Sequence, residues 1–99
     1  MDENRVTASE KKTITLADGK EYIVRKMTLG DAKKLLPAIQ KMDELRGSGN
    51  ISIELIDSMI DVAYQILVVE NKEVTKESLT DILELDTVPK LISITTGVA

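Results

Sequence analysis

The sequence contains no cysteine and no histidine, and each absence excludes a class of chemistry from this chain. Without cysteine, the chain cannot form disulfides, offer a thiolate nucleophile or build a cysteine-ligated zinc site. Without histidine, it lacks the side chain that most often serves as a general base near neutral pH and as a metal ligand. Catalytic triads and dyads that depend on an imidazole are therefore impossible, although carboxylates or a lysine of lowered pKa could still transfer protons.

Aromatic side chains are also scarce, because the chain has two tyrosines and neither phenylalanine nor tryptophan. Pockets for small molecules are usually lined with aromatic and apolar side chains, so we expect no enzyme activity and no cofactor. Nucleic-acid-binding surfaces stack bases on aromatic rings and hold the phosphates with basic side chains. A formal net charge of −4 and only two rings do not favour nucleic-acid binding.

Long hydrophobic runs are absent, since the longest uninterrupted aliphatic stretch covers residues 66–69. A transmembrane helix needs about 20 apolar residues, so none is predicted. Asp2 and Glu3 are followed by no apolar region, so no signal peptide is predicted either, and we expect a cytoplasmic protein. Ninety-nine residues, 42% of them hydrophobic and 30% charged, are typical of one small globular domain.

The patterning that is present predicts a mainly α (α+β) domain at residues 13–99, with a β-hairpin at residues 13–27 and about four helices at residues 28–99. Residues 1–12 are polar and aperiodic, and we interpret them as a disordered tail. The hairpin turns at Asp18-Gly19 through a two-residue or a three-residue loop. We prefer the three-residue loop because it places the apolar side chains on one face. These side chains are Ile14, Leu16, Tyr22 and Val24.

The first two helices are separated by the glycine-containing loop at residues 46–50. Thr28 is a candidate N-cap for the first helix, whose interior contains Pro37, so we expect a kink or a break into two pieces there. The second helix runs from about residue 52 to residue 69. It is apolar on most of its surface, so we expect it to be central and to pack against several elements of its own chain or against another subunit.

The last two helices are marked by their caps. Thr75 is a candidate N-cap for a third helix, with Val74 and Leu79 placed as a hydrophobic staple. A fourth helix begins at Asp86 or Thr87 and ends at Gly97.

Acidic side chains are concentrated after residue 50, because residues 51–71 carry four acidic residues and no basic one. Glu54, Asp57 and Asp61 lie on one face of the second helix at helical spacing. Such a face is usually solvated and keeps an apolar helix soluble, but it is also a candidate docking stripe for a basic partner. No calcium-loop spacing is present, and no metal site is predicted.

Met59 and Tyr64 lie on the same helix and complete the set of candidate partner-binding residues with the three acids. Methionine most often fills gaps in a core, and an adaptable partner groove is the alternative. The basic pairs at residues 11–12, 25–26 and 33–34 are short, lie on different elements and have no accompanying aromatics, so they do not indicate a nucleic-acid site.

Several short segments follow one another in a recognisable order. Residues 18–22 read D-G-K-E-Y between two strands, residues 28–31 read T-L-G-D at a helix start, and residues 74–83 read V-T-K-E-S-L-T-D-I-L. Asp86 and an aliphatic last helix follow. Over residues 13–96, this order of elements resembles the small tail assembly chaperones of long-tailed bacteriophages and prophages.

The resemblance implies a non-enzymatic protein that binds the long, aggregation-prone tape measure protein and helps to recruit tail tube subunits. It implies no catalytic residue, and self-association through apolar surface is expected with it. Two alternatives remain. The chain could be a minor structural component of a phage tail or head-joining region, or a small nucleic-acid-binding regulator, which the excess of basic residues in the first third favours.

Overall fold

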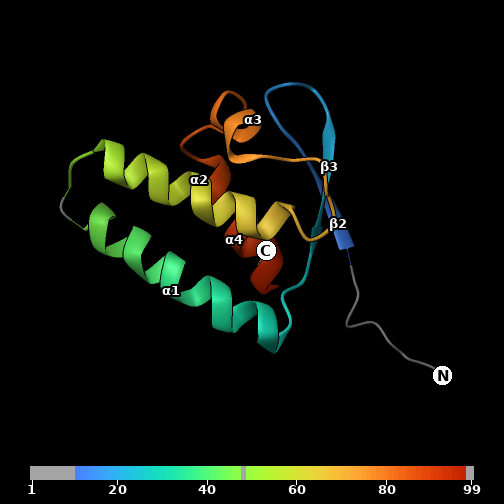
Figure 1. The fold of residues 1–99 in the computed structure, drawn as a ribbon, viewed down its shortest axis with the longest axis horizontal. Coiled ribbons are helices and arrows are strands. Elements are labelled where there is room, and N and C mark those ends of the chain that lie inside the picture. The colour runs from blue at the N-terminus through green and yellow to red at the C-terminus, as the bar shows by residue number, and fades with distance from the viewer. Residues whose placement is uncertain (1–10, 48, 98–99) are drawn as a thin grey trace.

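A computed structural model describes residues 11–47 and 49–97, which form a two-stranded hairpin followed by four helices (Figure 1). The mainly α fold with an N-terminal hairpin is therefore confirmed. Most of the predicted tail, residues 1–10, lies outside the described residues, whereas Lys11 and Lys12 already belong to the first strand. The elements are β2 (Lys11–Thr15), β3 (Glu21–Arg25), α1 (Leu29–Arg46), α2 (Ile53–Leu67), α3 (Lys76–Thr80) and α4 (Thr87–Thr96).

The hairpin has the three-residue loop that the apolar pattern predicts. Ile14 lies opposite Tyr22, and the N–H of Leu16 donates to the carbonyl of Lys20 at 3.1 Å. Gly19 has a φ of 80°, the left-handed conformation that this loop requires. The register places Leu16 and Val24 in the core, so the face chosen by the alternation is the one that packs on the helices.

Helix α1 begins with a capping box. The N–H of Asp31 donates to Thr28 Oγ1 at 3.1 Å, and the N–H of Thr28 donates to Asp31 Oδ2 at 3.1 Å. The helix then runs unbroken through Pro37, so the expected break into two pieces is wrong. Proline has no N–H to donate to the carbonyl of Lys33. Because both residues are exposed, water can satisfy that carbonyl.

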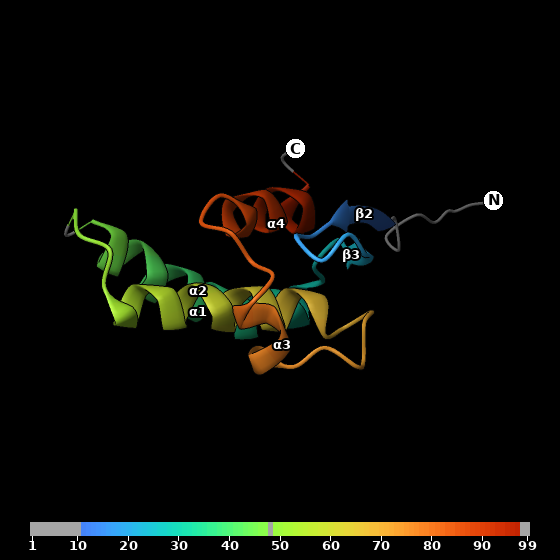
Figure 2. The same cartoon turned by 90° about the horizontal axis from the view of Figure 1, so that it is seen from above.

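Helix α2 is the centre of the molecule, as its nearly all-round apolar surface predicts. It packs against α1, α3, α4 and β3. Figure 2 shows α3 and α4 on opposite sides of α2, and Figure 1 shows α1 running alongside it. Val62, Ala63 and Leu67 are completely buried among these elements. The apolar surface of α2 is thus covered mainly by its own chain, except near its first turn.

The two C-terminal helices follow their predicted caps in part. Thr75 forms a capping box with Ser78 at the start of α3. Asp86 occupies the N-cap position of α4 but makes no side-chain cap hydrogen bond there. Thr87 is buried instead, and its Oγ1 accepts from the N–H of Glu84 at 3.2 Å. Gly97 ends α4 with a φ of 81°.

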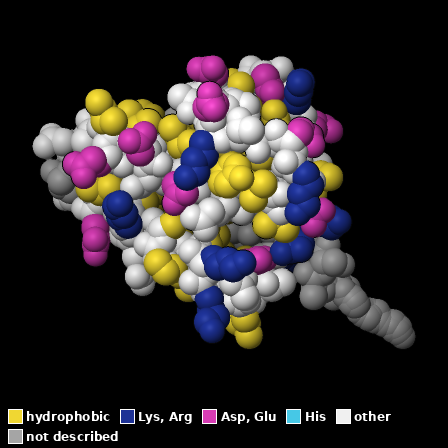
Figure 3. Space-filling view, in the orientation of Figure 1, with side chains coloured by type: hydrophobic (Ala, Val, Ile, Leu, Met, Phe, Trp, Pro, Cys, Tyr) yellow, Lys and Arg dark blue, Asp and Glu magenta, His cyan; other side chains and the backbone are white. Residues whose placement is uncertain are grey.

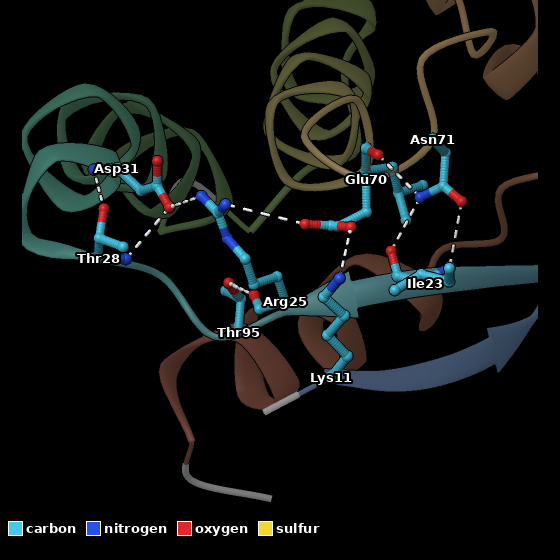
Figure 4. Close-up of polar contacts among 9 residues, drawn as sticks. Lys11, Ile23, Arg25, Thr28, Asp31, Glu70, Asn71 and Thr95 are labelled. Carbon is cyan, nitrogen blue, oxygen red and sulfur yellow. Dashed lines mark hydrogen bonds and ion pairs between the residues drawn. The ribbon is translucent and has the colours of Figure 1, made fainter. Parts of the chain in front are cut away.

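Side chains from the helical part hold the outer edge of β3 (Figure 4). The N–H of Ile23 donates to Asn71 Oδ1 at 3.1 Å, and Asn71 Nδ2 donates to the carbonyl of Ile23 at 2.8 Å. Thr95 Oγ1 donates to the carbonyl of Arg25 at 2.8 Å. These bonds satisfy backbone groups that a third strand would otherwise pair.

The guanidinium of Arg25 adds charge to the same connection. It lies 2.7 Å from Asp31 at the start of α1 and 3.8 Å from Glu70 just after α2, and Lys11 reaches Glu70 at 3.1 Å (Figure 4). The hairpin is thereby fixed to the beginning of one helix and the end of another.

Candidate partner-binding surface

The predicted acidic stripe lies in a hollow between α1 and α2. Glu54, Asp57 and Asp61 line it together with Lys41 of α1 and Lys76 of α3. The negative charge of Asp61 is balanced, because its carboxylate lies 3.1 Å from Lys76 Nζ. The same carboxylate accepts a hydrogen bond from Gln65 Nε2 at 3.1 Å. Glu54 and Asp57 are exposed and form no ion pair with any residue that the structure describes. The free negative charge therefore lies at the N-terminal end of the stripe.

The structure separates the other two predicted residues from this stripe. Met59 is 8% exposed and belongs to the core. Tyr64 is half-buried, and Lys76 Nζ lies 5.8 Å from the centre of its ring, within cation–π distance. Lys76 thus contacts both Asp61 and Tyr64, whereas Met59 faces a different hollow. The five residues do not form one site.

That second hollow, which we call the apolar groove, lies between α2 and the segment that crosses it from α3 to α4 (Figure 2). Its volume is about 300 Å³. Met59 and Val88 are buried, Ile60 and Leu83 are half-buried, and the other four lining side chains are exposed. The lining residues are Ile56, Met59, Ile60, Thr80, Leu83, Glu84, Leu85 and Val88.

Exposed aliphatic side chains surround the apolar groove. Leu85 on its wall is 56% exposed and Ile56 is 39% exposed. Ile51 and Ile53, at the start of α2, are 64% and 77% exposed. On a helix, Ile53 shares a face with Ile56 and Ile60, so the apolar surface continues from the groove over the first turn of α2. A contiguous exposed apolar patch is a feature of interaction sites in folded proteins, so this surface is a candidate.

Glu84 is the only acidic side chain among the residues that line the apolar groove, and Glu54 and Asp57 line the other hollow. More acidic side chains lie elsewhere on the two segments that form the groove. Residues 53–60 and 80–88 contain five acidic side chains and no basic one. Of these five, only Asp86 is in an ion pair within the described part of the chain, with Lys90 at 3.4 Å. Figure 3 shows hydrophobic and acidic side chains next to one another over the end of the molecule where α2 begins. The two segments that form the apolar groove therefore carry net negative charge.

The sequence patterns do not predict the apolar groove, and the reason can be identified. Ile51 and Ile56 are spaced as a hydrophobic staple, which predicts that they pack on each other, yet both are exposed. Leu85 lies in a connector, where periodicity carries no information about burial. The one available signal was the apolar face shared by Ile53, Ile56 and Ile60, which borders the acidic stripe.

Two shifted carboxyl groups lie in structural positions. Tyr22 Oη donates to Asp18 Oδ2 at 2.7 Å, which lowers the pKa of Asp18 and raises that of Tyr22. The N–H of Thr28, and then the guanidinium of Arg25, lower the pKa of Asp31. These shifts stabilise the hairpin turn and the start of α1, and neither group lines the apolar groove.

Within residues 11–47 and 49–97, no group of three or more acidic side chains could hold a metal ion. Over the same residues, no helix is long and apolar enough to cross a membrane. No protein-family model, no curated protein and no solved structure matches this chain. Among the features of the described residues, the apolar groove is the one on which the proposed function rests.

Proposed function

We propose that this chain is a non-enzymatic protein that binds amphipathic helices at the apolar groove. The observation that carries the proposal is the exposure of aliphatic side chains at the apolar groove and over the first turn of α2, on Leu85, Ile56 and Ile53. An amphipathic helix laid along such a surface buries its own apolar stripe against these side chains. Each large aliphatic side chain that becomes fully buried contributes about 1.5–3 kcal/mol, so three or four of them suffice for specific binding.

Within that class, we propose a tail assembly chaperone of a long-tailed phage or prophage, acting in the host cytoplasm. Its client is the tape measure protein, and the bound complex is joined by tail tube subunits. The order of the hairpin and the four helices, with the D-G-K-E-Y turn and the T-L-G-D helix start, supports this assignment by resemblance. The apolar groove supports it physically, because covering the apolar faces of a client's helices keeps that client from aggregating.

Co-expression of the chain with the tape measure protein of the same phage or prophage tests the proposal. We expect the wild-type chain to raise the soluble fraction of the tape measure protein and to co-purify with it. The double variant Ile53→Asp, Leu85→Asp places two charges on the apolar groove and should lose both effects. Leu29→Asp is the matched control, because Leu29 is 87% exposed on α1 and lies outside the groove.

Three results would count against this function. If the tape measure protein remained insoluble with the wild-type chain, or if the groove variant solubilised it equally well, the proposed client or the proposed surface would be wrong. Detection of the chain in purified phage particles would favour a minor structural component instead, since an assembly chaperone is absent from the finished particle.

A further inference from the structure

The hollow between α1 and α2 contains a buried hydroxyl group. Ser58 of α2 lines this hollow and is 9% exposed. A serine inside a helix often donates its hydroxyl to the carbonyl four residues earlier. The Ser58 hydroxyl instead makes no hydrogen bond with any residue that the structure describes. Because the side chain lines the hollow, its unused donor and acceptor are available to a group that enters there.

Two carboxylates line the same wall of the hollow as this hydroxyl. Glu54 lies one helical turn before Ser58, and both Glu54 and Asp57 are exposed and form no ion pair with any described residue. Asp61 is already paired with Lys76 at 3.1 Å. The α2 wall thus offers two free carboxylates and one free hydroxyl, all of which accept hydrogen bonds. We call the space between this wall and α1, of about 330 Å³, the charged hollow.

The facing wall of the charged hollow, which belongs to α1, carries one free cation. Lys41 is exposed and forms no ion pair with any described residue. The two free carboxylates of Glu54 and Asp57 and the one free ammonium of Lys41 leave a net charge of −1. A ligand group with a single positive charge therefore neutralises the hollow. Repulsion from Lys41 favours a position for that group on the α2 side.

A guanidinium group matches these acceptors better than other cations do. Within the described residues, no group of three or more acidic side chains is suited to a metal ion. A lysine ammonium is compact and strongly hydrated, so it loses more hydration on entering a partly enclosed site. A guanidinium is planar and weakly hydrated and has five N–H donors. It can therefore donate to the Ser58 hydroxyl and to the Glu54 carboxylate at the same time.

We propose that the charged hollow binds the side chain of an arginine that a partner protein presents. Its guanidinium donates to Ser58 Oγ and to the carboxylates of Glu54 and Asp57. The hollow borders the exposed apolar surface of α2, because Asp57 lies one turn after Ile53. A protein that covers Ile53 thus has the hollow within reach of a long side chain. The choice of a partner protein as the source rests on the proposed function, whereas the guanidinium site itself does not.

Titration of the isotope-labelled chain with N-acetyl-arginine amide tests the site at low ionic strength. The blocked ends of this probe leave the guanidinium as its only charge. Amide chemical shifts measured by nuclear magnetic resonance locate the binding site and give the dissociation constant. We expect the largest shifts at residues 54–61, with a dissociation constant in the millimolar range. N-acetyl-lysine amide, which carries the same charge, should bind at least about fivefold more weakly.

Variants of the lining residues should change the dissociation constant in opposite directions. Ser58→Ala should raise it by about fivefold, because the guanidinium loses an acceptor. The double variant Glu54→Gln, Asp57→Asn should abolish measurable binding. Lys41→Gln should lower the constant by about threefold, because a like charge is removed. Glu44→Gln is the matched control: Glu44 is exposed on α1 outside the hollow, so losing its charge should change the constant by less than about twofold. The amide spectrum of each variant shows directly whether it is folded.

Three outcomes would overturn the proposal. The first is the absence of shifts at residues 54–61, and the second is equal affinity for the arginine and lysine probes. The third is binding of free L-arginine at least about tenfold more tightly than the blocked probe, because the site would then recognise a free amino acid. Solubility of the tape measure protein is a separate measurement. A chain that solubilises it without binding the probe overturns only this inference, and a chain that binds the probe without solubilising it overturns only the proposed function.

Discussion

At the scale of single residues, Asn71 connects the helical part of the molecule to the hairpin. Its side chain exchanges two hydrogen bonds with the backbone of Ile23, and Nδ2 also donates to the carbonyl of Leu67 at 2.8 Å. An amide side chain has a donor and an acceptor side by side, so it can donate to and accept from the same peptide edge. Asn71 is 9% exposed, so water cannot readily replace it.

We predict that Asn71→Ala lowers the free energy of unfolding by about 2–4 kcal/mol, because buried backbone groups lose their partners. Urea denaturation followed by circular dichroism measures the change. Gln40→Ala removes an exposed amide from α1 and should change stability by less than about 0.5 kcal/mol. A loss no larger than that of the control would show that the Asn71 bonds do not stabilise the hairpin.

Asp31 gives a second prediction at this scale, through its lowered pKa. The carboxylate accepts from the N–H of Thr28 and pairs with Arg25, so its contribution to stability is fully present above the ordinary pKa of 3.8. It is lost as the pH falls through the lowered pKa of the folded protein. Asp31→Asn should therefore destabilise the protein by about 1 kcal/mol at neutral pH, the usual worth of an N-terminal cap interaction.

Urea denaturation of the wild type and of Asp31→Asn between about pH 6 and about pH 2 tests this pH dependence. The difference between their free energies of unfolding should disappear only at the acid end of that range. Asp43→Asn is the control, because Asp43 is exposed near the other end of α1 and lies 4.0 Å from Arg46. If the difference in the free energy of unfolding did not depend on pH, the charge of Asp31 would contribute nothing to stability.

At the scale of elements, Pro37 is the clearest conflict between local preference and tertiary structure. It lies in the interior of an 18-residue helix that continues past it. An interior proline costs about 3 kcal/mol relative to alanine, because it removes one hydrogen bond and crowds the preceding turn. Leu35 and Met42, buried on either side of Pro37, hold both halves of the helix on α2. Packing therefore outweighs the local penalty.

We predict that Pro37→Ala raises the free energy of unfolding by about 1–3 kcal/mol, since the exposed site regains a donor for the carbonyl of Lys33. Thermal or urea denaturation checks this. Gly30→Ala, in the first turn of the same helix, should gain no more than about 1 kcal/mol, since its new Cβ would meet Thr28 Oγ1 at an ordinary 3.7 Å. No gain for Pro37→Ala would indicate that α1 is strained there for another reason.

The sequence predicts the helices and strands well because caps and turns depend on residues that are close together in the sequence. The cap at Thr28, the loop that ends at Gly19 and the cap at Gly97 all involve residues a few positions apart, and all three are present. Periodicity also placed α2 at the centre. Pro37 was misjudged because its local penalty is offset by packing on another helix, which no local rule contains.

The candidate site was predictable only in part for the same reason. The alignment of Glu54, Asp57 and Asp61 follows from helical spacing, but the partner that neutralises Asp61, Lys76, comes from another helix. The apolar groove joins residues 56–60 with residues 80–88, and the crossing of one over the other is a tertiary property. The prediction that Met59 fills the core is confirmed by its 8% exposure. Its side chain also lines the apolar groove, and partner binding at Met59 stays a prediction.

At the scale of the whole molecule, the fold distributes stability unevenly. Helix α2 is enclosed by four other elements, whereas the outer edge of β2 carries exposed Thr13 and Thr15, whose backbone groups have no hydrogen-bond partner among the described residues. The outer edge of β3, by contrast, is bonded to Asn71 and Thr95. The two edges of one small sheet should therefore open with different free energies.

Native-state hydrogen exchange tests this difference residue by residue. We expect the amides of Val62 and Ala63 in α2 to exchange only through global unfolding, because they are completely buried. The amide of Ile23 should be nearly as slow, since its acceptor Asn71 follows α2 directly and can leave only if that junction opens. The amides of Thr13 and Thr15, two residues apart on the outer edge of β2, should exchange at close to the rate of an unfolded chain.

The variant Asn71→Ala serves as the internal control for this pattern. It should release the amide of Ile23 selectively, while Tyr22 and Val24, whose amides alternate with it and face β2, keep more of their protection. If Ile23 and Val24 instead lost protection together, the hairpin would open as one unit. The hydrogen bonds of Asn71 would then stabilise the pairing of β2 with β3 and not only the outer edge of β3. Slow exchange at Thr13 and Thr15 in a strictly monomeric sample would contradict this prediction, because it would show that the β2 edge is covered in solution.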